Sequence, residues 1–146
     1  MANVSVGQEA PDFTLRNEDN QPLKLSELRG KPVVLVFYPL DFSPLCTSEM
    51  CAIRDDYSSF QAKGAQVLGA SFDPVDANKK FAEKFGFPYP LLSVSKEMGM
   101  QFGAADSKDQ GTAKRVAYLI GADGKVKRVW PKATPATFAD EVLKDL

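Results

Sequence analysis

Residues 33–38 form an unbroken apolar run, VVLVFY, between Pro32 and Pro39. A strand with one face in water alternates apolar and polar residues, whereas a strand without polar positions is buried on both faces. Such strands lie in the middle of a sheet that has parallel neighbours and helices on both sides. The run therefore predicts an α/β fold built around residues 33–38.

Five other short runs have the composition of strands. They are residues 12–15, 22–25, 66–72, 116–120 and 126–130. The first two are separated by a polar turn and indicate an opening hairpin. The last two are joined through Asp123-Gly124, a pair typical of tight turns, and indicate a closing hairpin. Residues 66–72 supply a second central strand.

Three helices are expected to begin where a capping side chain directly precedes a proline. The pairs are Ser43-Pro44, Asp73-Pro74 and Thr134-Pro135. The side-chain oxygen can accept from first-turn amides, and proline at the first helical position loses no hydrogen bond. One helix is expected after Pro44, because apolar residues recur there at spacings of three and four as far as Phe60. A shorter helix is expected near residues 96–102.

This order of elements matches a thioredoxin-like α/β fold, with a central mixed β-sheet flanked by helices and an N-terminal β-hairpin extension. A flavodoxin-like sheet is the alternative, and the closing hairpin disfavours it. The 146 residues contain no linker or repeat. One core suits this length, so residues 1–146 are expected to form a single domain.

Charge and hydropathy exclude several classes of protein. Eighteen Lys and Arg against nineteen Asp and Glu give a net charge of -1, which does not favour binding to nucleic acid. No apolar run approaches the roughly 20 residues of a membrane span, so no membrane partner is expected. Residues 1–4 lack the features of a secretion signal, and a cytoplasmic location is expected.

The counts of histidine and cysteine narrow the chemistry further. The chain has no histidine, which excludes catalytic triads with a His base and the usual His-rich zinc sites. Its two cysteines, Cys46 and Cys51, are too few for a structural zinc site or an iron–sulfur cluster. No metal or other cofactor is therefore expected. Redox chemistry is the leading hypothesis for the two thiols, and two inert thiols are the alternative.

Cys46 occupies a position that suits a reactive thiol. With Ser43 as the cap and Pro44 as the first helical residue, Cys46 falls in the first turn of a helix that follows the central strand. Unpaired amides and the positive end of the helix dipole stabilise a thiolate there. The carboxyl end of such strands is also where α/β folds bind ligands. The alternative is that Cys46 is a small buried apolar residue, as most free cysteines are.

Pro39, Ser43 and Cys46 match the Pro-x-x-x-Thr/Ser-x-x-Cys signature of the peroxiredoxins, which the chain therefore resembles. Cys51, five residues after Cys46, and the following Arg54 resemble the peroxiredoxin Q, or bacterioferritin comigratory protein, subfamily. The likeness extends over the segments 7–15, 69–92, 115–120 and 129–146.

The resemblance implies a thioredoxin-dependent thiol peroxidase that takes part in antioxidant defence. Cys46 would be the peroxidatic residue, which attacks hydrogen peroxide or an organic hydroperoxide and becomes a sulfenic acid. Cys51 would be the resolving residue, which forms a disulfide with Cys46. Thioredoxin or a glutaredoxin-like protein would then reduce the disulfide. A monomer is expected, with a weak dimer as the alternative.

The same resemblance assigns roles to three further residues. Arg115 would stabilise the thiolate and the developing negative charge, a task that suits a permanently charged guanidinium. Ser43 would form a hydrogen bond with the peroxide, and Pro39 would shield the sulfur. Without the resemblance, Arg115 would be interpreted as a solvated charge and Ser43 as a helix cap alone.

The chain departs from the family pattern at three positions. Ser43 stands where threonine is frequent, so the hydroxyl is kept and the methyl group is lost. Leu45 stands where this subfamily usually has glycine, which would narrow the peroxide funnel or make it more apolar. Val94 replaces a residue that is commonly acidic. None of the three changes removes a reacting group.

Two other functions are compatible with part of the sequence. A disulfide oxidoreductase is disfavoured because it normally uses Cys-x-x-Cys, whereas four residues separate Cys46 from Cys51. A redox-sensing module that keeps the fold without turnover is the second alternative. Glu49 is expected to act through electrostatics at the helix start, and Trp130 to be a core residue.

Overall fold

The computed structural model describes residues 4–146; residues 1–3, which belong to the predicted domain, lie outside the described residues. The elements in chain order are β1 (Thr14–Arg16), β2 (Pro22–Lys24), a 3-10 turn (Leu25–Leu28), β3 (Val33–Phe37), α1 (Pro44–Asp55), α2 (Tyr57–Ala62), β4 (Gln66–Ser71), α3 (Val75–Phe85), β5 (Leu91–Ser93), α4 (Lys96–Gln101), β6 (Ala117–Ile120), β7 (Val126–Trp130) and α5 (Phe138–Asp145). None of the helices in the described part of the chain is long and apolar enough to cross a membrane.

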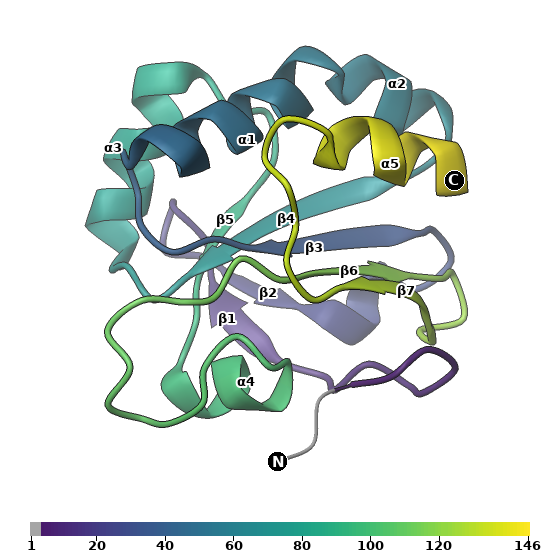
Figure 1. Ribbon diagram of the computed structural model, residues 1–146, viewed down its shortest axis with the longest axis horizontal. Helices are drawn as coiled ribbons and strands as arrows, with labels where there is room; N and C mark the ends of the chain where they lie inside the picture. Colours follow the sequence, from purple (N-terminus) through teal and green to yellow (C-terminus); the bar gives the residue numbers. More distant parts are fainter. Residues whose placement is uncertain (1–3) are drawn as a thin grey trace.

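The seven strands form one mixed sheet in the order β2-β1-β5-β4-β3-β6-β7 (Figure 1). The three strands β3, β4 and β5 are parallel. β6 pairs antiparallel with β3, and β7 with β6, so the predicted closing hairpin is confirmed. The predicted opening hairpin, β1 and β2, joins the other edge of the sheet through the pair Arg16 and Ser93. The central mixed sheet with an N-terminal hairpin is thus confirmed.

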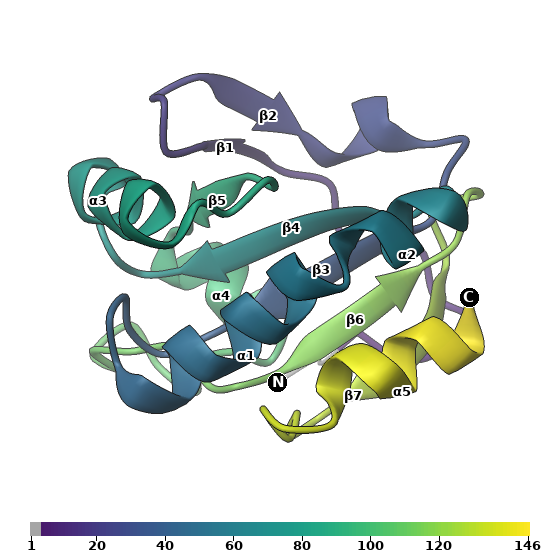
Figure 2. The same ribbon diagram turned by 90° about the horizontal axis from the view of Figure 1, so that it is seen from above.

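β3 is buried along its whole length, as its composition predicts. Alternate side chains, represented by Val34 and Val36, enter a core beneath α1, α2, α3 and α5. The intervening side chains, represented by Leu35, enter a second core with α4 and the 3-10 turn. Figure 2 shows α1, α2 and α5 lying across the strands on the first face. The strand therefore supports two separate cores.

Two elements differ from the sequence prediction. The single helix expected as far as Phe60 is two helices, because the backbone leaves helical geometry at Asp56 (φ −99°, ψ 11°). β5 was not predicted, since it has only three residues and a strand this short leaves no alternating pattern. It forms because Gly69 and its neighbours on β4 pair with it in parallel.

The predicted side-chain caps are wrong at all three proline pairs. The Ser43 hydroxyl donates to the Leu40 carbonyl (3.0 Å) and does not accept from a first-turn amide. Asp73 instead accepts from the Asp41 amide, and α3 begins one residue later than expected. The carbonyl of Thr134, rather than its side chain, accepts the first bonds of a turn that precedes α5.

Gly69 provides a test of how tightly the first core is packed. A Cβ atom at this position would lie 2.7 Å from Leu91 Cδ2 and 2.9 Å from Met50 Cε. Gly69→Ala should therefore lower the free energy of unfolding by about 1–3 kcal/mol, measured by denaturant titration. The control is Gly111→Ala, where the added methyl group meets no atom within 4 Å. Equal stability of the two variants would contradict the packing described here.

Candidate active site

The site lies where β3 ends and α1 begins, at the carboxyl end of the parallel strands. Phe42 turns the chain with a positive φ of 66°, and Ser43 returns to extended geometry as the N-cap of α1. Thr47 N donates the first helical bond to Ser43 O (2.9 Å), so Cys46 occupies the first turn, as predicted. The Cys46 side chain is fully buried.

Arg115 contacts the sulfur of Cys46 although it lies 69 positions further along the chain. Its Nη2 donates to Cys46 Sγ at 3.3 Å. The sheet creates this contact, because β6 pairs with β3 and Phe37 N donates to Val116 O (2.8 Å) at the same end. Arg115 therefore lies directly beside the loop that leads to α1. The Arg115 side chain is only 14% exposed, so Arg115 is not the solvated charge of the alternative interpretation.

Glu49 completes a buried cluster with Cys46 and Arg115; the sequence allowed Glu49 a hydrogen bond near the site but favoured electrostatics at the helix start. Arg115 Nη1 donates to Glu49 Oε1 at 2.9 Å, and Glu49 is fully buried one helical turn after Cys46. Burial raises the pKa of Glu49 to about 7, and Arg115 only partly offsets this effect. Its Oε2 has no hydrogen-bond partner among the described residues. The spacing of three from Cys46 placed Glu49 on the buried face of α1 and could have indicated this role.

Ser43 and Pro39 lie on the loop before Cys46 and form no hydrogen bond with its sulfur. The Ser43 hydroxyl is half-buried, and with its proton given to Leu40 O it has a lone pair free to accept. Pro39 is half-buried at the start of the loop. Three exposed apolar side chains stand on the same segment: Leu40 (45% exposed), Phe42 (48%) and Leu45 (61%). The approach to the site is therefore apolar.

Cys51 lies on a different side of α1 from Cys46. Its side chain is partly buried and packs against the first core, and both cysteines are free thiols. Burial raises the pKa of Cys51, while the neighbouring Arg54 acts in the opposite direction. The structure thus places Arg115 against Cys46, whereas Cys51 packs against the core to which Cys46 belongs and has Arg54 as its charged neighbour.

A second buried carboxyl, Asp41, anchors the loop, and the sequence analysis did not identify it. Asp41 Oδ1 accepts from the Tyr38 hydroxyl (2.8 Å), and its Oδ2 accepts from the Asn78 side-chain amide (2.6 Å). The Asp41 amide donates to Asp73 Oδ2 at 2.7 Å. These bonds tie the loop to the end of β4 and to α3. Burial, followed by the charge of Asp73, raises the pKa of Asp41 to about 7.

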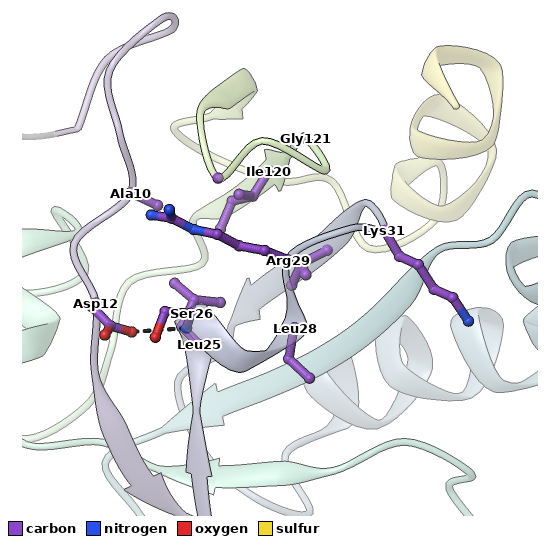
Figure 3. Close-up of a pocket in the computed structure, with 11 residues that line it drawn as sticks. Ala10, Asp12, Leu25, Ser26, Leu28, Arg29, Lys31, Ile120 and Gly121 are labelled. Carbon is purple, nitrogen blue, oxygen red and sulfur yellow. Dashed lines mark hydrogen bonds between the residues drawn. The ribbon is translucent and has the colours of Figure 1, made fainter.

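A small hollow lies at the opposite end of β3 (Figure 3). Its lining includes Val33 and Ile120, whereas Cys46 lies beyond the other end of the strand. The volume of about 20 Å³ is enough for about one water molecule. It is therefore not a substrate site. Within residues 4–146, no group of three or more His, Cys, Asp or Glu side chains is arranged to hold a metal ion.

Comparison with known proteins gives consistent matches along the chain. Residues 6–129 match the model of the AhpC/TSA family. A chloroplastic peroxiredoxin Q of Sedum lineare is 38% identical over 98% of this chain and 78% of that protein. Peroxidoxin BcpB of Mycobacterium tuberculosis superposes with a TM-score of 0.90 at 35% identity, covering 97% of this chain and 96% of that one. The bacterioferritin comigratory protein of Xanthomonas campestris, described for its alkyl peroxide reduction activity, gives 0.86 at 28% identity, covering 99% and 96%.

Removing the Arg115 side chain should lower the reactivity of Cys46. In Arg115→Ala, the guanidinium that lies 3.3 Å from the sulfur is lost, and its positive charge is lost with it. Peroxide consumption should therefore slow by roughly 100-fold, measured as the rate of hydrogen peroxide loss. Arg115→Lys serves as the control, because it keeps the charge and loses the forked pair of donors. An unchanged rate in Arg115→Ala would contradict a role for Arg115 at Cys46.

Asp41 should make stability depend on pH in a direction opposite to that of most carboxyl groups. Its pKa rises from 3.8 to about 7 on folding. Between these two pH values, the folded state therefore holds a proton that the unfolded state has lost. The stability associated with that proton is present below pH 3.8 and is lost as pH rises towards 7. Asp41→Asn cannot titrate. Its stability relative to wild type should therefore improve by about 1–4 kcal/mol between pH 4 and pH 8. Denaturant titrations across this range measure the difference, and a constant difference would contradict the burial of the carboxyl group.

Proposed function

The chain belongs to the AhpC/TSA family, within which it is a peroxiredoxin of the peroxiredoxin Q or bacterioferritin comigratory type, and we propose that Cys46 is its peroxidatic residue. Proteins of this type are peroxidases, so the chain is a thiol peroxidase and an antioxidant enzyme with a thioredoxin-like fold. The observation that carries the assignment to Cys46 is the 3.3 Å hydrogen bond from Arg115 to its sulfur.

In the proposed reaction, the Cys46 thiolate attacks the terminal oxygen of a hydroperoxide. An S–O bond forms and the O–O bond breaks, so the sulfur is oxidised by two electrons to a sulfenic acid. The departing oxygen takes up a proton and leaves as water or an alcohol. Arg115 stabilises both the thiolate and the charge that develops on the departing oxygen. Glu49 holds the guanidinium in this position through its own ion pair.

The start of α1 supplies the remaining polar groups. The amides of Leu45 and Cys46 precede the first helical bond, which Thr47 donates, and are available to the peroxide oxygens. The Ser43 hydroxyl can accept from the peroxide in its present orientation, or donate after it turns away from Leu40 O. Pro39 limits access of water from the β3 side of the loop.

Hydroperoxides are the substrates of this family, and we propose that this chain accepts organic hydroperoxides as well as hydrogen peroxide. The exposed side chains of Leu40, Phe42 and Leu45 give the approach an apolar rim, which suits an alkyl group. Leu45, which replaces the usual glycine, adds to this rim. The alkyl peroxide activity described for the protein of Xanthomonas campestris supports this choice.

We further propose that Cys51 resolves the sulfenic acid and that α1 must unwind to allow it. Both cysteines lie on α1, and five residues of regular helix give about 7.5 Å of rise and 140° of rotation. The two Cα atoms are then roughly 8.5–9 Å apart, whereas a disulfide requires about 7 Å or less. Unwinding also exposes apolar surface to a reductant. The family implies a thioredoxin-type reductant, and thioredoxin itself or a glutaredoxin-like protein is proposed here.

Four expectations from the sequence are retained as proposals. The chain is proposed to form one domain over residues 1–146 and to act as a monomer, with a weak dimer as the alternative. A cytoplasmic location is proposed as well, although the relative from Sedum lineare is chloroplastic. Neither nucleic acid nor a membrane is proposed as a partner.

The two cysteine roles are separated by one experiment. Cys46→Ser should abolish peroxide consumption, because a serine hydroxyl is a far weaker nucleophile than a thiolate. Cys51→Ser should consume one equivalent of peroxide at the wild-type rate and then stop as a sulfenic acid when thioredoxin is the reductant. Mass spectrometry after one equivalent of peroxide should show a Cys46–Cys51 disulfide in wild type. Substantial turnover by Cys46→Ser would refute the peroxidatic assignment, and wild-type recycling of Cys51→Ser would refute the resolving one.

A further inference from the structure

We propose that the hydrogen bond from the Tyr89 hydroxyl to the backbone of α1 slows the resolution step. Tyr89 is therefore a positioning residue, which acts on disulfide formation by holding α1 in its folded position. The inference rests on the proposed function, in which Cys51 resolves the sulfenic acid of Cys46. Tyr89 is 1% exposed, and its hydroxyl donates to the backbone carbonyl of Met50 at 2.6 Å. Met50 lies between the two cysteines and directly precedes Cys51.

The two sulfurs are held towards different parts of the sheet. Cys46 Sγ accepts from Arg115, which precedes β6. Cys51 lies beside Arg54 and near Tyr89, which precedes β5. Burial, and after it the nearby Cys51, raises the pKa of the Tyr89 phenol. Two strands, β4 and β3, separate β5 from β6. Figure 2 shows α1 lying above the strands between α3 and α5. Disulfide formation therefore requires the Cys51 turn of α1 to leave its present position.

The Met50 turn is held through both its side chain and its backbone. Met50 is fully buried, and its Cε packs over Gly69 beside Leu91. The Tyr89 hydrogen bond fixes the backbone at the same residue. On the next turn, Arg54 Nη1 donates to the Phe85 carbonyl at 2.6 Å. The bond from Tyr89 exists only in the folded helix, so it opposes unwinding and is lost when the turn opens.

The hydrogen bond from Tyr89 affects which of two competing reactions the sulfenic acid of Cys46 undergoes. In resolution, the Cys51 sulfur attacks the sulfenic sulfur of Cys46. An S–S bond forms, the S–O bond breaks, and the hydroxyl leaves with the thiol proton as water. If the helix stays folded, a second hydroperoxide can instead oxidise the sulfenic acid to a sulfinic acid and leave as water or an alcohol. The rate at which α1 opens therefore decides between recycling and inactivation.

Tyr89→Phe removes the hydroxyl and keeps the ring. Losing one buried hydrogen bond changes an opening equilibrium roughly fivefold. We expect disulfide formation after one equivalent of hydrogen peroxide to be roughly fivefold faster than in wild type, measured by rapid quenching, alkylation and mass spectrometry. The rate of peroxide consumption should be unchanged. The fraction of Cys46 converted to sulfinic acid under excess hydrogen peroxide should fall, and amide exchange over residues 47–54 of the reduced protein should be faster.

Tyr118→Phe is the matched control. Tyr118 is equally buried, and its hydroxyl also donates to a backbone carbonyl, that of Phe102. Phe102 directly follows α4, which covers the opposite face of the sheet from α1. A general loss of stability should therefore affect both variants, whereas faster resolution and resistance to excess peroxide should appear only in Tyr89→Phe.

Each other outcome overturns the proposal. Resolution at the wild-type rate in Tyr89→Phe would show that Met50 stays anchored during the step. Slower resolution would show that Tyr89 holds Cys51 in a productive position. Slower peroxide consumption would place the effect at Cys46 itself. Failure of wild type to form a Cys46–Cys51 disulfide would instead refute the proposed function, on which the role of the Tyr89 hydrogen bond depends.

Discussion

The guanidinium of Arg115 is the interaction on which the rest of the site depends. It donates one hydrogen bond to the Cys46 sulfur and another to Glu49, and both of these side chains are fully buried. A buried charge without a partner is strongly destabilising, so the three groups have to be held together. The chain contains no histidine to share this charge. Because β6 places Arg115 at the start of α1, one guanidinium reaches both buried side chains.

The register of the strands, rather than the loops, places Arg115 beside Cys46. Val36 pairs with Ala117, which fixes Arg115 at the level of the turn that follows β3. On the other side, β4 ends beside the same turn, and Asp73 receives the amide of Asp41. The loop that leads to Cys46 is thus held from both neighbouring strands. Phe42 adds a third anchor, because its ring packs against Phe81 and Phe85 of α3 at centroid distances of 5.1 and 6.3 Å.

Local sequence predicted the parts of the site that depend on local rules. The apolar composition of β3 and the proline at the start of α1 were enough to place Cys46 in a first helical turn, and the structure agrees. Arg115 came from the family resemblance, because a contact over 69 residues leaves no local pattern. Asp41 was missed, and the burial of Glu49 against Arg115 was ranked second to electrostatics at the helix start, for the same physical reason. Their burial is decided by strands and helices that are distant in sequence, and carboxyl groups are usually exposed. The caps failed because Ser43 and Asp73 found other hydrogen-bond partners within the folded loop.

The break between α1 and α2 at Asp56 has a consequence for the size of any opening. Helix formation propagates along a continuous run of backbone bonds, so a melted segment spreads until that run is interrupted. Here it is interrupted at Asp56, directly after α1, and Tyr57–Ala62 form a separate helix. Phe60, which is fully buried, belongs to that second helix. Unwinding of α1 can therefore stop at Asp55, so that Met50 and Ile53 leave the core while Phe60 keeps its place in it.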